Sequence, residues 1–168
     1  MDNIENEELE TDDFDWLDEI LQNADDQIIQ DFFKFKASNG NTILHELFDY
    51  MPFLDSIQKY SPNIDFTIEG EHNLTPLELA ITSVNCDAVS VLLDIGAPIT
   101  SFRNENLLTD VSFDGREFSD HASNSNMELD TYVQESIKYN ISLLENKGAT
   151  ISTNTKEKAA TFNICLSF

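Results

Sequence analysis

Hydrophobic residues recur at helical spacing between residues 73 and 99 and predict two short helices joined by a tight turn. Thr75 is a favourable N-cap, Pro76 occupies the first helical position, and Glu78 completes a capping box three residues after the cap. Gly96 ends the second helix, because glycine readily adopts the left-handed conformation found there. The apolar positions are Leu77, Ala80, Ile81 and Val84 in the first helix and Val89, Leu92 and Leu93 in the second. Neither helix can bury its apolar side alone, so the pattern predicts a unit that stacks on others.

A second opening of the same kind lies 33 residues upstream, where Thr-Ile-Leu-His occupies positions 42–45. This spacing is the period of ankyrin repeats. The Thr-Pro-Leu-Glu-Leu-Ala run at 75–80 resembles the T-P-L-H-x-A opening of that family, and Leu-Leu-Asp-Ile-Gly-Ala at 92–97 resembles its L-L-x-x-G-A ending. The resemblance covers about residues 40–100 and implies an all-α solenoid that binds other proteins. Glu78 replaces the family's histidine, which preserves the cap but not the usual histidine hydrogen bonds.

The same pattern predicts one domain, an ankyrin-repeat solenoid of about four helix pairs. Its first pair is an amino-terminal cap whose apolar residues are Phe14, Leu17, Ile20, Leu21, Ile28, Ile29, Phe32, Phe33 and Phe35. The predicted parts are a disordered acidic tail (1–11), the domain (12–151) and a carboxyl-terminal tail (152–168). The domain divides into the cap (12–39), repeat one (40–72), repeat two (73–105) and a diverged third repeat (106–151). Residues 101–126 form a polar insert that we expect to be disordered.

Acidic residues dominate the charge: 32 Asp and Glu against 9 Lys and Arg give a formal net charge of −23. Such a chain is repelled by nucleic-acid backbones and anionic membranes, so we expect neither as a direct partner. The family resemblance places binding on the concave face, which is formed by the tips of the extended loops between repeats (the fingers) and by the first helix of each repeat. The predicted contact residues are Glu46, Asp49, Ile68, Glu69, Glu71, His72, Leu74, Glu78 and Thr82. We therefore expect a monomer that binds a protein with a basic rim and an apolar centre.

No catalytic, cofactor or metal constellation is found in the sequence. His45 occupies the family's structural position, His72 lies at a predicted loop tip, and His121 sits in a polar insert that gives a triad no rigid support. Gly-rich phosphate loops, HExxH and paired Cys/His spacings are missing. We predict that the protein is not an enzyme and holds no cofactor.

Two other hypotheses remain open for the amino-terminal region. Leu-Asp-Glu-Ile-Leu at 17–21 resembles the L-x-x-E-I-L start of an F-box helix, which would make residues 12–36 a ubiquitin-ligase adaptor. Only about twenty residues separate it from the first repeat, where an F-box needs about forty, so repeat logic favours a cap. Alternatively, the acidic terminus mimics nucleic acid and occupies a basic cleft.

The chain termini bear on location. The amino terminus lacks the charged and apolar regions of a signal peptide, no run approaches a membrane span, and two distant cysteines suggest no disulfide. We expect a cytoplasmic protein. Eukaryote-like repeats in an Asn-rich, Ile-rich and Lys-poor chain favour a secreted effector of an intracellular bacterium, acting in the host cytoplasm. The last four residues, Cys165 to Phe168, resemble a C-a-a-X prenylation box, which would add membrane association. The alternatives are a tail that packs on the last helix and an export signal.

Overall fold

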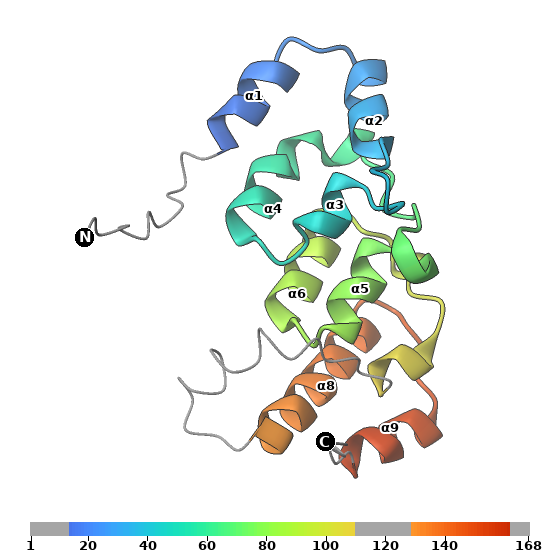
Figure 1. The fold of residues 1–168 in the computed structure, drawn as a ribbon. Coiled ribbons are helices and arrows are strands. Elements are labelled where there is room, and N and C mark those ends of the chain that lie inside the picture. The colour runs from blue at the N-terminus through green and yellow to red at the C-terminus, as the bar shows by residue number, and fades with distance from the viewer. Residues whose placement is uncertain (1–13, 110–128, 162–168) are drawn as a thin grey trace, which may run out of the picture.

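The computed structural model describes residues 14–109 and 129–161 of the chain (Figure 1). Its α-helices are α1 (Asp15–Leu21), α2 (Asp26–Lys34), α3 (Ile43–Glu46), α4 (Met51–Ile57), α5 (Pro76–Thr82), α6 (Cys86–Asp94), α8 (Leu129–Asn146) and α9 (Thr153–Ala160). Short 3₁₀ helices are η2 (Gln58–Asn63), η3 (Glu71–Asn73), η4 (Ile99–Ser101) and η5 (Glu105–Leu108). These two ranges contain no strand, so the described chain is all-α, as predicted.

Consecutive helix pairs are stacked side by side along the molecule (Figure 1). Helix α3 packs against α5, α4 packs against α6, and α6 packs against α8. One hydrophobic core runs through all of these layers, from Leu17 in α1 to Ala159 in α9. Each pair therefore covers the apolar side that its neighbour leaves open.

Thr42 and Thr75 begin equivalent, adjacent helices, as the 33-residue spacing predicts. Each is the N-cap of its helix, α3 or α5, and each forms a capping box with the third helical residue. In α5 the backbone N–H of Glu78 donates to the Thr75 hydroxyl (3.2 Å), and the Thr75 N–H donates to the Glu78 carboxylate (3.1 Å). In α3 the Thr42 N–H donates to Nδ1 of His45 (3.3 Å).

Helix α3 is a single turn that ends at Glu46, and α4 begins at Met51 with Pro52 in its first turn, where a missing N–H leaves no hydrogen bond unmade. One local feature differs from the sequence prediction. Val84 does not extend α5. It lies in the turn to α6 at φ 56°, an unusual conformation for a β-branched residue, and is 1% exposed. Burial of its side chain offsets this local strain.

The carboxyl-terminal region is more ordered than predicted. Residues 153–160 of the expected tail (152–168) form α9 on α8 with Thr155 and Ala159 buried, which agrees with the alternative of a tail that packs on the last helix. Residues 101–109 of the expected insert are also folded, with Leu108 in the core. Residues 153–160 contain only two alanines as apolar residues, and residues 101–109 contain only Phe102, Leu107 and Leu108, so both segments give a weak periodic signal. Val133, Ile137, Ile141 and Leu144, three or four residues apart along α8, are buried.

A pair of neighbouring alanines tests whether α9 belongs to the domain. Ala159 is 1% exposed, whereas Ala160 is exposed. We expect Ala159→Asp to lower the free energy of unfolding by at least about 2 kcal/mol, because an ionised carboxylate would be buried. Ala160→Asp is the matched control and should change it by less than about 0.5 kcal/mol. Urea denaturation measures both; equal effects would contradict the docking of α9.

Candidate protein-interaction surface

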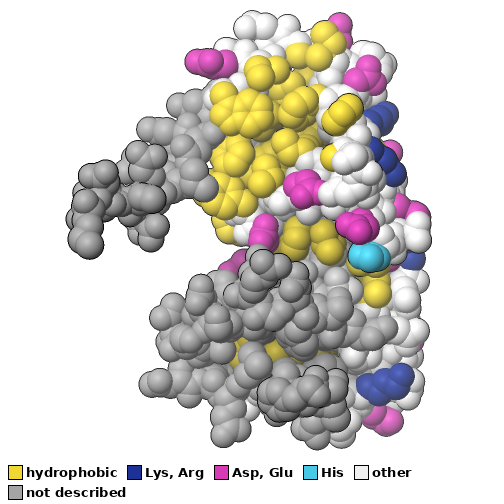
Figure 2. Space-filling model, viewed as in Figure 1, with side chains coloured by type: hydrophobic (Ala, Val, Ile, Leu, Met, Phe, Trp, Pro, Cys, Tyr) yellow, Lys and Arg dark blue, Asp and Glu magenta, His cyan; other side chains and the backbone are white. Residues whose placement is uncertain are grey.

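Exposed hydrophobic side chains gather at the amino-terminal end of the stack. Figure 2 shows them over α1, α3 and α4, with acidic side chains at the border and a histidine on the same side of the molecule. Trp16 is 43% exposed and Ile20 is 57% exposed, while Phe14, Tyr50 and Met51 are half-buried beside them. We call these five residues the apolar face. Ile28 and Phe35, from α2 and its C-cap, are exposed as well.

Helix α1 presents two apolar stripes in different directions. Leu17 and Leu21, four residues apart, point into the core and are at most 1% exposed. Trp16 and Ile20 are also four residues apart and lie on an adjoining stripe of the same helix. Because the Leu stripe fixes the helix on the core, the Trp16–Ile20 stripe is left facing outwards.

An aromatic cluster supports the apolar face from below. The ring centroid of Phe14 lies 5.4 Å from that of Tyr50, 5.5 Å from that of Phe53 and 6.4 Å from that of Trp16. Phe53 is fully buried. Tilted aromatic pairs at these separations are favourable beyond their buried area. Trp16 therefore stands on a packed base that connects α1 with the start of α4.

Polar contacts fix the first helix pair to the layer below. The Asp18 carboxylate accepts hydrogen bonds from the Tyr60 hydroxyl (3.1 Å) and from Lys59, and Asp26 accepts one from the Asn63 amide (3.0 Å). Burial, and then the hydrogen bond to Asp18, raise the pKa of Tyr60 above its ordinary value. The hydroxyl thus remains a donor. These contacts hold α1 and α2 on η2.

Carboxylates border the apolar face near α3 and α4. Asp49 is exposed and lies between Phe48 and Tyr50 in the chain. Glu46 is exposed and accepts hydrogen bonds from the side-chain amides of Asn39 and Asn41, both at 2.8 Å. These two amides lower the pKa of Glu46. The border is therefore negatively charged at neutral pH.

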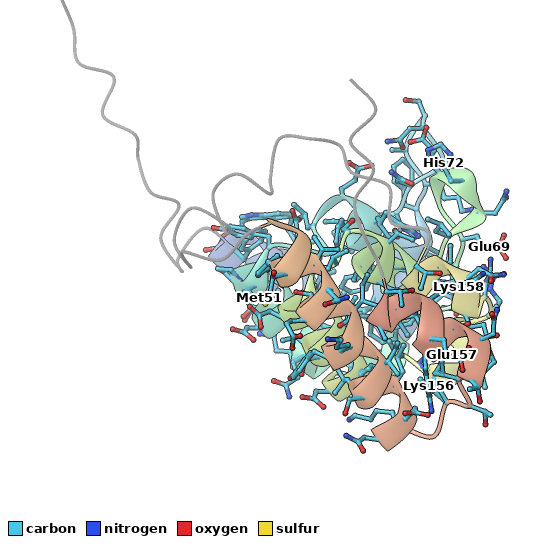
Figure 3. The ribbon with its side chains drawn as sticks, turned by 90° about the horizontal axis from the view of Figure 1, so that it is seen from below. Met51, Glu69, His72, Lys156, Glu157 and Lys158 are labelled. Atoms are coloured by element: carbon cyan, nitrogen blue, oxygen red, sulfur yellow. The ribbon has the colours of Figure 1, made fainter. Side chains whose placement is uncertain are left out.

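The segment 65–74, which we call the finger, is held over the start of α3. Lys36 Nζ donates to the Glu69 carbonyl (2.7 Å), and the Glu71 N–H donates to the Asn41 side chain (2.7 Å). A Cβ atom at Gly70 would lie 2.5 Å from Asn41 Oδ1 and 2.6 Å from His45 Cδ2. Gly70 is thus needed for this close approach rather than for a special dihedral angle. At the tip, His72 is exposed and projects from the edge of the molecule opposite Met51 (Figure 3).

His45 connects Thr42, the N-cap of α3, to the finger. Its Nδ1 accepts from the Thr42 N–H, so the hydrogen is assigned to Nε2, which donates to the Leu74 carbonyl (3.0 Å). The residue is buried. Burial is the main cause that lowers the pKa of His45, and the Leu74 carbonyl opposes it only in part. The predicted structural role of His45 is therefore confirmed, and the neutral imidazole is the form that fits.

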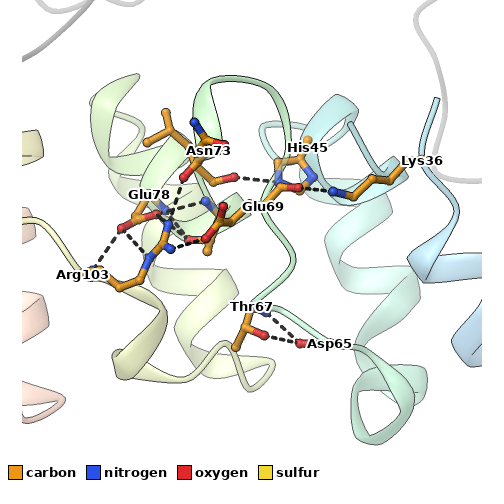
Figure 4. A network of polar contacts seen from close by, with 10 residues as sticks. Lys36, His45, Asp65, Thr67, Glu69, Asn73, Glu78 and Arg103 are labelled. Atoms are coloured by element: carbon orange, nitrogen blue, oxygen red, sulfur yellow. Dashed lines mark hydrogen bonds and ion pairs between the residues drawn. The ribbon is translucent and has the colours of Figure 1, made fainter. Parts of the chain in front are cut away.

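Glu78 makes the equivalent connection in the next layer, but with a different partner (Figure 4). Besides capping Thr75, its carboxylate accepts from the backbone N–H of Arg103 (3.0 Å) and from the guanidinium (2.8 Å). The same guanidinium donates to the Asn73 carbonyl (2.9 Å) and to the Glu69 carboxylate. Arg103 therefore joins the finger, α5 and the segment after η4.

The pKa of Glu78 results from opposing influences. Burial raises it, but hydrogen bonds from the Arg103 side chain and from the backbone of Thr75 and Arg103 outweigh burial, so the pKa lies below its ordinary value of 4.5. Hydrogen bonds to Glu78 raise the pKa of Arg103. A group with a lowered pKa stabilises the fold above its unfolded pKa and loses this effect as the pH falls through the folded value. The Glu78 contribution is therefore complete at neutral pH.

The predicted contact residues are only partly brought together. Glu46, Asp49, Glu71 and His72 are exposed, whereas Ile68, Glu69 and Leu74 are half-buried. Two residues require correction: Glu78 is 1% exposed and Thr82 is 5% exposed, so neither lies on an accessible surface. Glu78 is turned inward by its cap and Arg103, and the Thr82 hydroxyl donates to the Leu79 carbonyl (2.9 Å). His121 and the proposed lipidation site Cys165 lie outside the described residues.

Sequence reasoning missed the outward stripe of α1 and the role of Arg103. The stripe had a signal, because α1 carries apolar residues over a wider arc than one core-facing side requires. No local pattern in the sequence indicated the role of Arg103, since its partners lie 25 or more residues away.

Comparison with models of protein families, with curated proteins and with solved structures finds no match to this chain. Within residues 14–109 and 129–161, none of the helices is long and apolar enough to cross a membrane. The same residues contain no group of three or more His, Cys, Asp or Glu arranged to hold a metal ion.

We predict that Arg103→Met destabilises the protein by about 1–3 kcal/mol, because the buried Glu78 carboxylate loses its charged donor. The guanidinium is partly exposed, so solvent screening keeps the effect below that of a fully buried pair. Lys138→Met is the matched control, since Lys138 forms a surface ion pair with Glu135 (2.8 Å). Thermal or urea unfolding should show little change for the control. Similar effects of both substitutions would refute the role of Arg103 as a clamp, that is, as the residue that joins Glu78 to the finger.

The lowered pKa of His45 predicts that its contribution to the stability of the fold decreases as the pH falls. Because its pKa is lowered in the folded state, its contribution is complete above its ordinary value of 6.5 and is lost as the pH falls through the folded value. The wild type should therefore lose stability relative to a His45→Gln variant as the pH is lowered from neutral through the folded pKa of His45. His45→Gln keeps a capping side chain without a titrating group, so its unfolding midpoint should fall less over that range. Parallel pH profiles would contradict the assignment.

Proposed function

We propose that this chain is a non-enzymatic protein-interaction module of the ankyrin type, which binds a partner protein through the apolar face, with the finger at the opposite edge as a further contact. The observation that carries the proposal is an exposed hydrophobic stripe, Trp16 and Ile20, next to the Phe14–Phe53 aromatic pair. Exposed apolar residues with a polar border are the usual composition of an interaction site.

The ankyrin-type solenoid is itself part of the proposal. It is supported by two capping boxes 33 residues apart, by the stacking of α3 on α5 and α4 on α6, and by a finger that each N3 side chain helps to anchor. In such an array, finger tips and first helices provide a binding surface without chemistry.

The charge favours a partner with basic groups. The chain carries a net charge of −23, and Glu46, Asp49 and Glu71 are exposed on or near the proposed surface. Opposite charges at an interface accelerate encounter and improve specificity. Membrane association through Cys165 and action in a host cytoplasm remain hypotheses from the sequence.

The ubiquitin-ligase adaptor is the second candidate. Leu17 and Leu21 of the L-x-x-E-I-L run are in the core, so a ligase component would contact only the outer stripe of α1. Recovery of ligase scaffold proteins on that stripe would favour the adaptor. A nucleic-acid mimic would instead lose its activity on deletion of residues 1–11, with binding at the apolar face intact.

Site-specific photo-crosslinking tests the proposed function. A benzoylphenylalanine at position 20 is placed on the apolar face, and the matched control is position 139, where Tyr139 is 53% exposed on α8. In a eukaryotic cell lysate we expect a discrete protein adduct from position 20 that position 139 does not give. Adducts that are the same at both positions, or none at position 20, would contradict the proposal.

A further inference from the structure

We infer that the partner's contact element is a cationic amphipathic helix, which lays an apolar stripe flanked by Lys or Arg on the apolar face. This inference rests on the proposed function and specifies the chemistry of the partner. Three observations support it: the spacing of the exposed side chains, the aromatic and polar contacts of their base, and the charge around them.

The spacing suits a helix. Trp16 and Ile20 are one turn apart on α1, about 6 Å along its axis, and form a ridge. A partner helix repeats its own apolar side chains at three and four residues, so its grooves accept such a ridge. Neighbouring layers of this chain already pack in this manner, helix against helix. A docked helix would therefore continue the packing beyond α1.

The base of the face is packed and hydrogen-bonded within the chain itself. Phe14 contacts the fully buried Phe53 and the half-buried Tyr50, and Asp18 is held by Tyr60 and Lys59. Binding therefore requires little ordering of α1. Rigid aromatic anchors in a preorganised surface are typical of the residues that dominate binding energy.

Charge selects a cationic helix. Glu19 adjoins Ile20, Asp49 adjoins Tyr50, and Asp55 follows Met51 by one turn of α4; all three are exposed and form no ion pair with another described residue. By contrast, Asp94 pairs with Lys147 (2.9 Å) and Glu145 with Lys156 (2.6 Å) in the later layers. Carboxylates at the border of the apolar face are thus available for cations from outside.

Neither a second copy nor the amino-terminal tail supplies these cations. A second copy brings another net charge of −23 to the interface. Residues 1–13 contain seven carboxylates and no Lys or Arg. Like charges at close range disfavour both occupants, and a basic partner removes the repulsion.

Trp16 allows a direct test, because it is the single tryptophan of the chain. The full-length protein is titrated with a synthetic peptide of about 18 residues, with Leu at i, i+3, i+4 and i+7 and Lys elsewhere. We expect a blue shift of Trp16 emission that saturates and weakens with added salt. The controls are a scrambled peptide of the same composition and a striped peptide with Glu in place of Lys; neither should produce the shift.

Variants locate the binding. Ile20→Ser should lower the affinity for the peptide at least about tenfold, whereas Tyr139→Ser on α8 should leave the affinity unchanged. Circular dichroism should show that both variants remain folded. The inference is overturned if the scrambled or the Glu peptide shifts Trp16 equally, if Ile20→Ser retains full affinity, or if sedimentation at the same concentration shows a dimer. A position-20 crosslink to a protein without a cationic helix would overturn this inference but leave the proposed function standing.

Discussion

The third residue of each inner helix performs two tasks, and the rest of the stack depends on both. The side chains of His45 and Glu78 accept hydrogen bonds from the backbone N–H of the N-cap residues Thr42 and Thr75, respectively. The His45 side chain also bonds to the Leu74 carbonyl, and the Glu78 side chain also bonds to the Arg103 N–H, each in a later segment of the chain. A helix start is thereby connected to the loop that leads to the next layer. Helices as short as α3 are marginal by themselves, so this connection and the shared core hold them in place.

The two connections differ in chemistry. His45 is neutral and donates to a carbonyl, whereas Glu78 is ionised and accepts from an N–H and a guanidinium. An imidazole can complete its bonding with backbone groups alone, but a buried carboxylate needs a cation nearby. Arg103 meets this requirement and in addition binds Glu69 in the finger. Glu78 stands where the preceding layer has His45, and its cationic partner comes from a segment 25 residues later.

Local patterns predicted much of this fold. Capping boxes, proline positions and apolar periodicity located α1, α2, α5 and α6, because those signals lie within one or two helical turns. The length of α3, the helix α9 and the clamp at Arg103 depend on contacts between distant segments, which periodicity does not contain. Among the predicted contact residues, Glu46, Asp49 and Glu71 are exposed, but Glu78 is buried, because a cap residue and a contact residue look alike in sequence. The exposure of Trp16 and Ile20 follows from how α1 sits on the core.

Amide hydrogen exchange at Arg103 is the most direct test of the connection between layers. Its N–H lies outside any helix and donates to the Glu78 carboxylate (3.0 Å). By NMR, this amide should exchange slowly in the wild type and at least about tenfold faster in Glu78→Ala. The Val89 amide, bonded to the Asn85 carbonyl (3.0 Å) in α6, should stay protected in both and report that the fold persists. An Arg103 amide that exchanges freely in the wild type, or that keeps its protection without Glu78, would contradict the account.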